Sequence, residues 1–593
     1  MIQLEKSTQT PEQLKEILYS QMSAESPHAY YKENVDSAKL YRAITSGRGL
    51  DDYMHQFKPR EDEALFEQRK RITCHIVPSV CKNVRDVEYK VPRSNSITKV
   101  FNVEEGNEDR AKKLHEVLDK FWGRYSFDNY MALRWIELND TDPNTFVVVE
   151  WKPFEKTDRA QPYPFEVTSE MSWNYAYENN ILLWLLVKNG DYTIYGANCT
   201  IKLSEVDVKE LYKELPNYIK EDGQEVEYQQ MRFIRFKKKY YLVTEPTPHN
   251  LGVVPAIQVG YMRDPSTNGL TYLPPWWAAL PTLRNLITAK SELDLTEALH
   301  VFPQKIRYAP RCQKEGCNAG KTPDGGICSG CKGTGYSGHT SSQDEITLAL
   351  PKDKEQMIDL VNLVHYVYPP TELIKYMDDY VDKLSARCMK QVYNSEIYSR
   401  DAIAETATGK NIDLQAVYDT LYPMVEEMSI DWEFLIAVIQ EVTELTGIKA
   451  SFFFSKDFKL KSLDNYYFDL QTVSQSGASS FIKASIEDDI ARMLYADDKF
   501  QHARYLTKRR FDPFPGDSEA IIQLKLRDTK VADESKILYL NYELIFDNLE
   551  LENPNIYFLN FDKQTQAVNA QIDKLKERLG EQQAATRTQF FGE

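Results

Sequence analysis

Apolar positions change their spacing along the chain, and each change predicts a different kind of element. Before residue 140 the apolar residues recur at helical spacing among many polar ones, which predicts helices at 11–19, 61–77 and 100–135. Residues 145–260 instead contain runs such as FVVVEW, ILLWLLV and MRFIRFKKKYYLV, separated by turn residues. Runs rich in β-branched and aromatic residues predict strands, so this region is expected to form a β-rich lobe.

The second half of the chain predicts helices around one turn-rich insert. Helical spacing covers 275–300 and returns after Pro369–Pro370, while residues 301–352 between them are rich in Gly and Cys. A long helix is predicted at 411–446, and 450–593 is expected to be mainly helical with a polar tail. The apolar residues that repeat along the helix after Pro370 are Leu373, Met377, Val381, Leu384, Cys388 and Val392. The sequence therefore predicts an α+β fold.

Composition excludes several classes of protein. The chain has 593 residues, 42% of them hydrophobic, which argues against a disordered chain, a collagen or a small disulfide scaffold. Its longest strongly apolar run, 181–187, is far shorter than the roughly 20 residues that span a bilayer, and we expect neither a membrane segment nor a signal peptide. The net charge is 72 − 89 = −17, which argues against tight wrapping of nucleic acid but leaves open a surface along which it slides.

Four of the eight cysteines form the clearest local motif, Cys312-x4-Cys317-x10-Cys328-x2-Cys331. Two cysteine pairs on tight turns can place four thiolates around Zn²⁺, and four Cys ligands leave no open position for water, so we expect a structural site. The glycines expected to supply positive φ angles are Gly316, Gly320, Gly325, Gly326, Gly330, Gly333 and Gly335. Two alternatives stay open: four reduced cysteines in a flexible loop, or a redox pair at Cys328 and Cys331.

Motifs of common enzymes are missing from the sequence. It contains no phosphate-binding Gly-x4-Gly-Lys-Ser/Thr loop, no Gly-x-Ser-x-Gly and no His-Glu-x-x-His. Acidic pairs such as Asp378/Asp379 and Asp488/Asp489 would suit a metal-dependent nuclease, but solvated helix faces are by far the commoner explanation of such pairs. We therefore do not expect an enzyme.

Several segments, read in order, resemble the portal proteins of tailed double-stranded DNA bacteriophages. Residues 39–86 resemble the portal N-terminal region, and HNLGVVPAIQVG (249–260) looks like the strand that ends the portal wing. The helix–insert–helix at 275–395 resembles the two stem helices with the clip between them. AIAETATGKNIDLQAVYDTLYPMVEEM (402–428) resembles the tunnel loop and the long helix after it.

The resemblance implies an elongated subunit with a mixed α/β wing, a two-helix stem, a clip carrying the cysteine insert, and a mainly helical crown. The implied domains are 1–270 (N-terminal region and wing), 271–300 (first stem helix), 301–368 (clip), 369–398 (second stem helix), 399–450 (tunnel loop and long helix) and 451–593 (wing return, crown and tail). A general portal clip does not contain a zinc-type insert, so this insert is a departure from the family pattern.

The resemblance also implies a function and partners. Portal proteins form a ring, normally of twelve subunits, at a capsid vertex, and DNA crosses the ring during packaging and ejection. The implied partners are further copies of the chain, the major capsid protein, the terminase, the head-completion adaptor and tail proteins, and transiently bound double-stranded DNA. The implied location is the virion, after assembly in the host cytoplasm.

Three groups of residues take roles from this resemblance. Residues of the tunnel loop are expected to face the DNA channel: Arg400, Ala402, Thr406, Thr408, Gly409 and Lys410. On the second stem helix Lys383, Arg387 and Lys390 are expected to touch phosphate, although pairing with Asp379 and Asp382 explains them equally well. The apolar stripe from Leu373 to Val392 is expected to pack against a neighbouring subunit, because an elongated subunit would leave it uncovered.

Two other classes of function remain open. One is a different structural or connector protein of the virion. The other is a DNA-packaging nuclease or ATPase subunit, which the missing nucleotide motifs disfavour.

Overall fold

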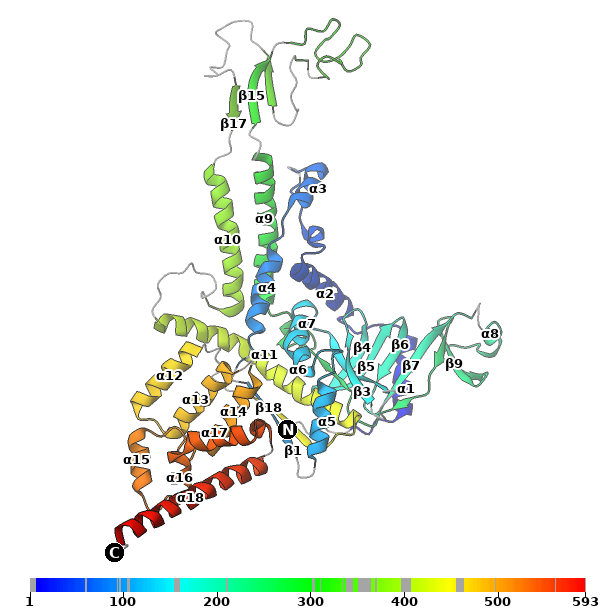
Figure 1. Cartoon of the computed structure of the whole chain (residues 1–593). Coiled ribbons are helices and arrows are strands. Elements are labelled where there is room, and N and C mark those ends of the chain that lie inside the picture. Colours follow the sequence, from blue (N-terminus) through cyan, green and yellow to red (C-terminus); the bar gives the residue numbers. More distant parts are fainter. Residues whose placement is uncertain are drawn as a thin grey trace. The chain divides into compact units, whose positions relative to one another are not determined.

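The computed structural model (Figure 1) describes most of the chain, in two compact units. The described residues are 7–58, 61–92, 94, 97–103, 107–153, 160–208, 212–300, 304–309, 311–333, 335–336, 345–349, 364–367, 371–395, 407–454, 463–495, 498–559 and 561–591. Unit 1 comprises Met1–Arg93 and Thr98–Phe458, and unit 2 comprises Ser94–Ile97 and Lys459–Glu593. The fold is α+β, as predicted, because unit 1 combines sheets with helices and unit 2 is mainly helical.

Four helices begin unit 1, and the helix predicted at 61–77 ends earlier than expected, at Ile72. The helices are α1 (Pro11–Ala24), α2 (Tyr31–Ser46), α3 (Glu63–Ile72) and α4 (Val77–Glu88). The expected continuous helix at 61–77 is interrupted because the Cys74 backbone N–H donates to Asp294 Oδ2 at 2.7 Å instead of continuing the helical ladder. Within α3, Arg69 is fully buried and donates to Glu61 and to Ser291 Oγ.

The next region departs from the predicted helix at 100–135. Its first part is strand β1 (Ile97–Val103), which pairs with β18 (Ile448–Phe454). The partner strand lies about 350 residues away along the chain, so local spacing could not reveal the pairing. The helices that follow are α5 (Glu108–Leu118), α6 (Phe127–Asn129) and α7 (Ile136–Thr141), with a π-helical segment at Tyr130–Trp135 between the last two.

The predicted β-rich lobe is confirmed and contains two sheets. The larger has the strand order β4-β5-β6-β7-β10-β9-β8, with β11 beside β7. Its strands are β4 (Ser172–Glu178), β5 (Ile181–Asn189), β6 (Asp191–Tyr195), β7 (Cys199–Val206), β8 (Glu225–Tyr228), β9 (Met231–Phe236), β10 (Lys239–Val243) and β11 (Thr247–Pro248). Helix α1 buries Leu14, Leu18 and Met22 against this sheet, and the short helix α8 (Leu215–Tyr218) precedes β8.

The smaller sheet has the order β12-β2-β3, all antiparallel. Its strands are β2 (Phe146–Pro153), β3 (Ala160–Val167) and β12 (Ala256–Gln258), and the hairpin β13 (Met262–Arg263) with β14 (Tyr272–Leu273) follows. Phe146 and Val148 of β2 pack with Leu185 and Val187 of β5 in one hydrophobic cluster. The two sheets therefore share a core.

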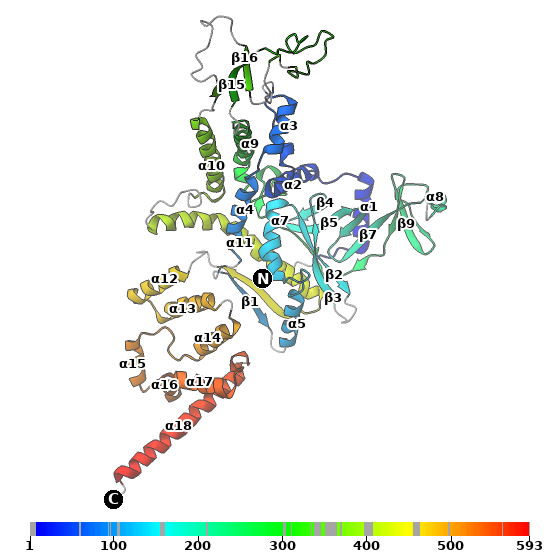
Figure 2. The ribbon, with the colours of Figure 1, turned by 45° about the horizontal axis from the view of Figure 1, so that its top comes forward.

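A pair of long helices follows the lobe, as predicted (Figures 1 and 2). They are α9 (Leu280–His300) and α10 (Thr371–Tyr393), which contact each other along their length. Thr282 Oγ1, at the start of α9, donates to Gln391 Oε1, at the end of α10, at 2.7 Å. The two helices are therefore antiparallel.

Between the two helices the chain forms a small sheet and the cysteine insert. The sheet has the order β16-β15-β17, with β15 parallel to β16 and antiparallel to β17. Its strands are β15 (Gln304–Ala309), β16 (Glu345–Ala349) and β17 (Val364–Val367). The insert itself, residues 311–336, lies between β15 and β16 in the chain.

After α10 comes α11 (Ala407–Val442), which contains Pro423 and contacts β2, β3 and β12. This helix begins four residues earlier than the predicted Asn411. Unit 2 then consists of helices around its own apolar cluster, which includes Ile545, Phe546 and Leu549. Its helices are α12 (Leu463–Ser476), α13 (Ser480–Leu494), α14 (Lys499–Phe511), α15 (Glu519–Arg527), α16 (Asp533–Leu540), α17 (Tyr542–Glu552) and α18 (Phe561–Phe591). The expected polar tail is thus helical up to Phe591.

Candidate metal centre

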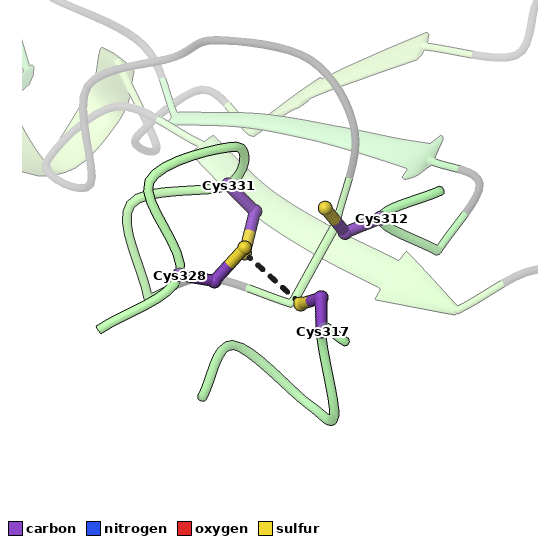
Figure 3. Close-up of side chains that lie close together, drawn as sticks. All are labelled: Cys312, Cys317, Cys328 and Cys331. Carbon is purple, nitrogen blue, oxygen red and sulfur yellow. Dashed lines mark hydrogen bonds between the residues drawn. The ribbon is translucent and has the colours of Figure 1, made fainter. Parts of the chain in front are cut away.

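The four cysteines of the insert lie together, as the motif predicts (Figure 3). The sulfur atoms of Cys312, Cys317, Cys328 and Cys331 all lie within 4.8 Å of one another, and Cys317 Sγ is 3.6 Å from Cys331 Sγ. With Zn–S bonds of about 2.3 Å, two sulfurs of a tetrahedral site are about 3.8 Å apart. The arrangement is therefore compatible with a zinc site.

Backbone hydrogen bonds close the insert into a compact loop. At its two ends Arg311 pairs with Tyr336, and the Cys312 N–H donates to the Gly335 carbonyl at 2.9 Å. Inside it, a hairpin turn forms at Asn318 and Lys321, which exchange backbone hydrogen bonds. These bonds bring residues that are up to 25 positions apart to the same place, because both ends of the loop are joined.

Glycines give the loop its tight turns, although not all of them in the expected way. Positive φ angles are found at Gly316, Gly320, Gly325, Gly333 and Gly335, as predicted. The expectation is wrong for two others, because Gly326 and Gly330 do not have positive φ. Gly330 instead leaves room for neighbouring side chains, since an added Cβ would lie 2.9 Å from Lys314 Cδ and 3.4 Å from Cys312 Sγ.

Hydrogen bonds from backbone N–H groups lower the pKa of two of the four thiols. Hydrogen bonds from the N–H groups of Cys331 and Gly330 lower the pKa of the Cys328 thiol to about 6. For Cys331 burial acts to raise the pKa, but donors such as the Gly335 N–H, 3.3 Å from its sulfur, outweigh burial and the pKa falls. Burial raises the pKa of Cys317 to about 12. N–H donors around a thiol favour thiolate, the form that binds metal.

The distances between the four sulfurs and the burial of the thiols can be compared with the two alternatives to a metal site, a disulfide-forming pair and a flexible loop. A disulfide needs its sulfurs about 2.05 Å apart, and all eight cysteines of the chain are free thiols. Cys328 and Cys331 are buried, with 1% and 6% of their surface exposed, although Ile327, the large aliphatic side chain of the insert, is 76% exposed. Thiols buried without an apolar core around them favour a closed metal site over a flexible loop.

The structure contradicts part of the expected oligomer interface on α10. Val381, Leu384, Cys388 and Val392 are at most 8% exposed in the single chain, because α9, α4 and neighbouring segments already cover them. The reasoning that an elongated subunit leaves this stripe for a neighbour is wrong for these four residues. It stays a prediction for Leu373, which is 49% exposed, and for the half-buried Met377.

The residues expected to face DNA belong to two segments, α10 and the expected tunnel loop. Lys383, Arg387 and Lys390 lie on α10 and are exposed, and Asp379 and Asp382 are exposed on the same helix, so both explanations of the basic residues stay open. Of the tunnel-loop residues, Arg400, Ala402 and Thr406 lie outside the described residues. Thr408, Gly409 and Lys410 belong to the first turn of α11.

A set of buried carboxyl groups in unit 1 was not predicted from the sequence. Glu88 accepts a hydrogen bond from Tyr261 at 3.0 Å, and Asp140 pairs with Arg85. Burial raises the pKa of Glu88 well above its usual range and that of Asp140 to about 6. The signal was present in the helical spacing: Glu88 follows the buried Val84 by four residues, which places it on the apolar face of α4.

Among the described residues, no helix is both long and apolar enough to cross a membrane. Comparison of the sequence with models of known protein families and with curated proteins finds no match.

Proposed function

We propose that this chain is the subunit of a portal ring, through which double-stranded DNA enters and leaves a viral capsid. The observation that carries the proposal is the order of elements in unit 1. A β-rich lobe is followed by the antiparallel pair α9 and α10, which brackets a separate small sheet with its insert, and then by the long helix α11. The resemblance implies this order of wing, stem, clip and long helix.

The charge of the chain supports the same proposal. Each chain carries a net charge of −17, so a ring of twelve would carry 12 × −17 = −204. A negatively charged wall repels DNA phosphates, which lets DNA move through a channel without adhering to it. The exposed basic residues of α10 would then give only transient phosphate contacts.

The cysteine insert has a structural role in this proposal. One Zn²⁺ held by Cys312, Cys317, Cys328 and Cys331 would supply the folding free energy that the insert lacks, because the insert has almost no apolar core. In the portal arrangement the insert belongs to the clip, which would dock the terminase during packaging and the head-completion adaptor and tail proteins afterwards. A rigid insert would keep that docking surface in one shape.

In this proposal the ring occupies one vertex of the capsid, in contact with the major capsid protein, and the chain has no catalytic role. Assembly in the host cytoplasm followed by incorporation into the virion is the corresponding route. Ring contacts would use surfaces other than the buried residues of α10, because α9 and α4 already cover those.

The deciding experiment is negative-stain electron microscopy of the purified full-length chain, combined with mass photometry. The chain weighs 68.9 kDa, so a dodecamer is expected at 12 × 68.9, or about 827 kDa, as a ring with a central hole. A chain that stays monomeric under assembly conditions, or that hydrolyses ATP, would contradict the proposal. Such a result would favour another connector protein or a packaging enzyme.

A further inference from the structure

A cavity of about 560 Å³ lies in unit 1 between α11 and the β-rich lobe. One wall is the face of α11 that carries Glu427 and Asp431, one turn apart. The opposite walls come from β4, β5, β12 and the β13–β14 hairpin. Figures 1 and 2 both draw α11 beside strands of this lobe, which agrees with its contacts to β2, β3 and β12.

Most of the cavity wall is apolar or aromatic. Leu182, Val254 and Phe434 line it together with the rings of Tyr177 and Tyr272. Cavities of this size, with apolar walls and a few polar groups, are the usual form of small-ligand sites. The size and lining therefore suit a side chain or a small organic molecule rather than a bare ion.

The side-chain amide of Gln258, a polar group of the cavity floor, already has hydrogen-bond partners. Gln258 accepts a hydrogen bond from Tyr177 at 3.1 Å and donates to Asn144 at 3.2 Å. Asn144 in turn accepts from the Tyr272 N–H and donates to the Tyr272 carbonyl. This network holds the floor of the cavity in place, and its amide groups do not need a ligand as a further hydrogen-bond partner.

Asp431 is different, because its charge has no cation beside it. The residue is 4% exposed, and its Oδ2 accepts one hydrogen bond, from Trp135 Nε1 at 2.8 Å. Among the described residues no Lys or Arg forms an ion pair with Asp431, and the charged group that acts on it is Glu427, of the same sign. A buried carboxylate with only a like-charged neighbour is costly unless a positive group compensates it, and without such a group burial raises the pKa of Asp431 well above its usual range.

The other charges at the cavity leave it one positive charge short. Burial raises the pKa of Glu427 and of Asp431, so a nearby cation is needed to keep both ionised. When both are ionised they contribute two negative charges, and the exposed Arg263 contributes one positive charge near Glu427. Three exposed apolar side chains stand at the same cavity, Ile181, Leu270 and Ile430. A singly charged cation with an apolar body would match both the charge and the lining.

We propose that this cavity binds an organic monocation, an ammonium, amidinium or guanidinium group on an apolar stem, with Asp431 as its anionic partner. The rings of Tyr177, Tyr272 and Phe434 would surround the stem and the edge of the cation. Such a group could be a free small amine or the Lys or Arg side chain of a second copy of the chain. The inference does not depend on the portal proposal.

Benzamidine is the probe, because it is an aromatic monocation whose amidinium can bind a carboxylate in bidentate fashion. Its neutral isostere benzamide is the matched ligand control. Binding to the full-length chain at pH 7.5 would be measured by isothermal titration calorimetry and saturation-transfer NMR. We expect saturable binding of benzamidine, with benzamide about tenfold or more weaker, since charge-assisted hydrogen bonds are about twice as strong as neutral ones.

Two variants and one control locate the binding. Asp431→Asn keeps an oxygen acceptor for Trp135 but removes the charge, so we expect benzamidine affinity to fall about tenfold or more. Glu427→Gln, which leaves the Trp135 hydrogen bond untouched, should weaken binding by a smaller factor. Glu426→Gln changes the adjacent exposed acid and should leave affinity unchanged. If Asp431→Asn fails to fold, as judged by near-ultraviolet circular dichroism, Glu427→Gln and benzamide decide the outcome.

Mass photometry with and without benzamidine distinguishes the two sources of the cation. If the natural occupant is a side chain of a second copy, saturating benzamidine will reduce the particle mass seen by mass photometry. If it is a free amine, benzamidine will bind without changing that mass. Binding that is not saturable, that benzamide equals, or that the variants at Asp431 and Glu427 leave unchanged would overturn the proposal.

Discussion

The cysteine insert and the α9–α10 helix pair that brackets it in the chain are held by different forces. The insert contains five glycines with positive φ, four thiols and one well-exposed large apolar residue, Ile327. The helix pair instead buries apolar side chains such as Leu283, Leu286 and Leu384. The insert therefore depends on hydrogen bonds and on metal coordination, whereas the helix pair depends on the hydrophobic effect.

Neighbouring segments of one chain can therefore be destabilised by different treatments. A chelator should act on the insert and leave the helix pair intact. A charge placed in the apolar contact should do the reverse. Each of the following changes tests one side of that contrast.

The largest effect is expected for Cys328→Ser. Structural zinc sites contribute roughly 10–16 kcal/mol of binding free energy near neutral pH, and serine is a much poorer ligand than thiolate, so bound zinc should fall from one per chain to nearly none. Elemental analysis of protein purified under reducing conditions without chelator measures this. Cys74→Ser, at an exposed cysteine outside the cluster, is the control and should keep its zinc. Wild-type protein free of zinc would refute the site.

Leu384→Asp should damage the helix pair and spare the insert. Leu384 is 5% exposed, so an aspartate there buries a charge without a partner, and we expect the free energy of unfolding to fall by about 3–5 kcal/mol. Urea denaturation followed by tryptophan fluorescence measures the loss. Leu373→Asp, on the same helix at a site 49% exposed, should change stability by less than about 0.5 kcal/mol. Equal losses at the two sites would contradict the burial of this stripe within the subunit.

Two glycines of the insert separate backbone strain from crowding. Gly320 and Gly325 both have positive φ, but an added Cβ would lie 2.2 Å from the Gly333 carbonyl oxygen at Gly320 and would meet nothing within 4 Å at Gly325. Gly325→Ala should therefore cost only about 1 kcal/mol, whereas Gly320→Ala should cost at least about twice as much. Competition of each variant with a chromogenic zinc chelator gives the ranking. Identical zinc affinities would show that the loop relaxes around Gly320.

The smallest effect is expected at the buried carboxyl groups of Glu88 and Asp140, which lie outside the insert. Burial raises the pKa of Glu88 and that of Asp140, the latter to about 6, so these groups take up protons on folding. Their stabilising effect is complete below the usual carboxyl pKa and is lost as pH rises through the raised values. Glu88→Gln keeps an acceptor for Tyr261 and should raise stability at pH 8 relative to pH 5 by about 1 kcal/mol.

Urea denaturation of this variant at pH 5 and pH 8 measures the change. Asp86→Asn, at an exposed acid on the same helix paired with Lys82, is the control and should leave the pH dependence unchanged. A pH dependence that Glu88→Gln does not alter would mean that Glu88 is ionised in the folded protein.

Local interactions account for what the sequence could predict. The cysteine cluster, the strands of the β-rich lobe and α10 depend on residues close together in the chain, and each was found from spacing alone. The pairing of β1 with β18 depends on segments far apart in the chain, so residue spacing suggested a helix instead. The burial of Val381 and Leu384 also depends on distant segments, so spacing suggested an exposed surface there. The cavity at Asp431 combines residues from 177 to 434, and only an acid in a helical run of apolar residues hinted at it.

The 3.6 Å separation of Cys317 Sγ and Cys331 Sγ has a consequence for handling the protein. Oxidation that joins these two sulfurs would release two electrons and remove two ligands at once, which leaves too few thiolates to retain a tetrahedral metal. Air or peroxide should therefore eject the metal in one step rather than gradually. Samples stored with a thiol reductant and free of chelators should stay uniform, while aged samples should divide into a metal-bound and a disulfide-bonded population.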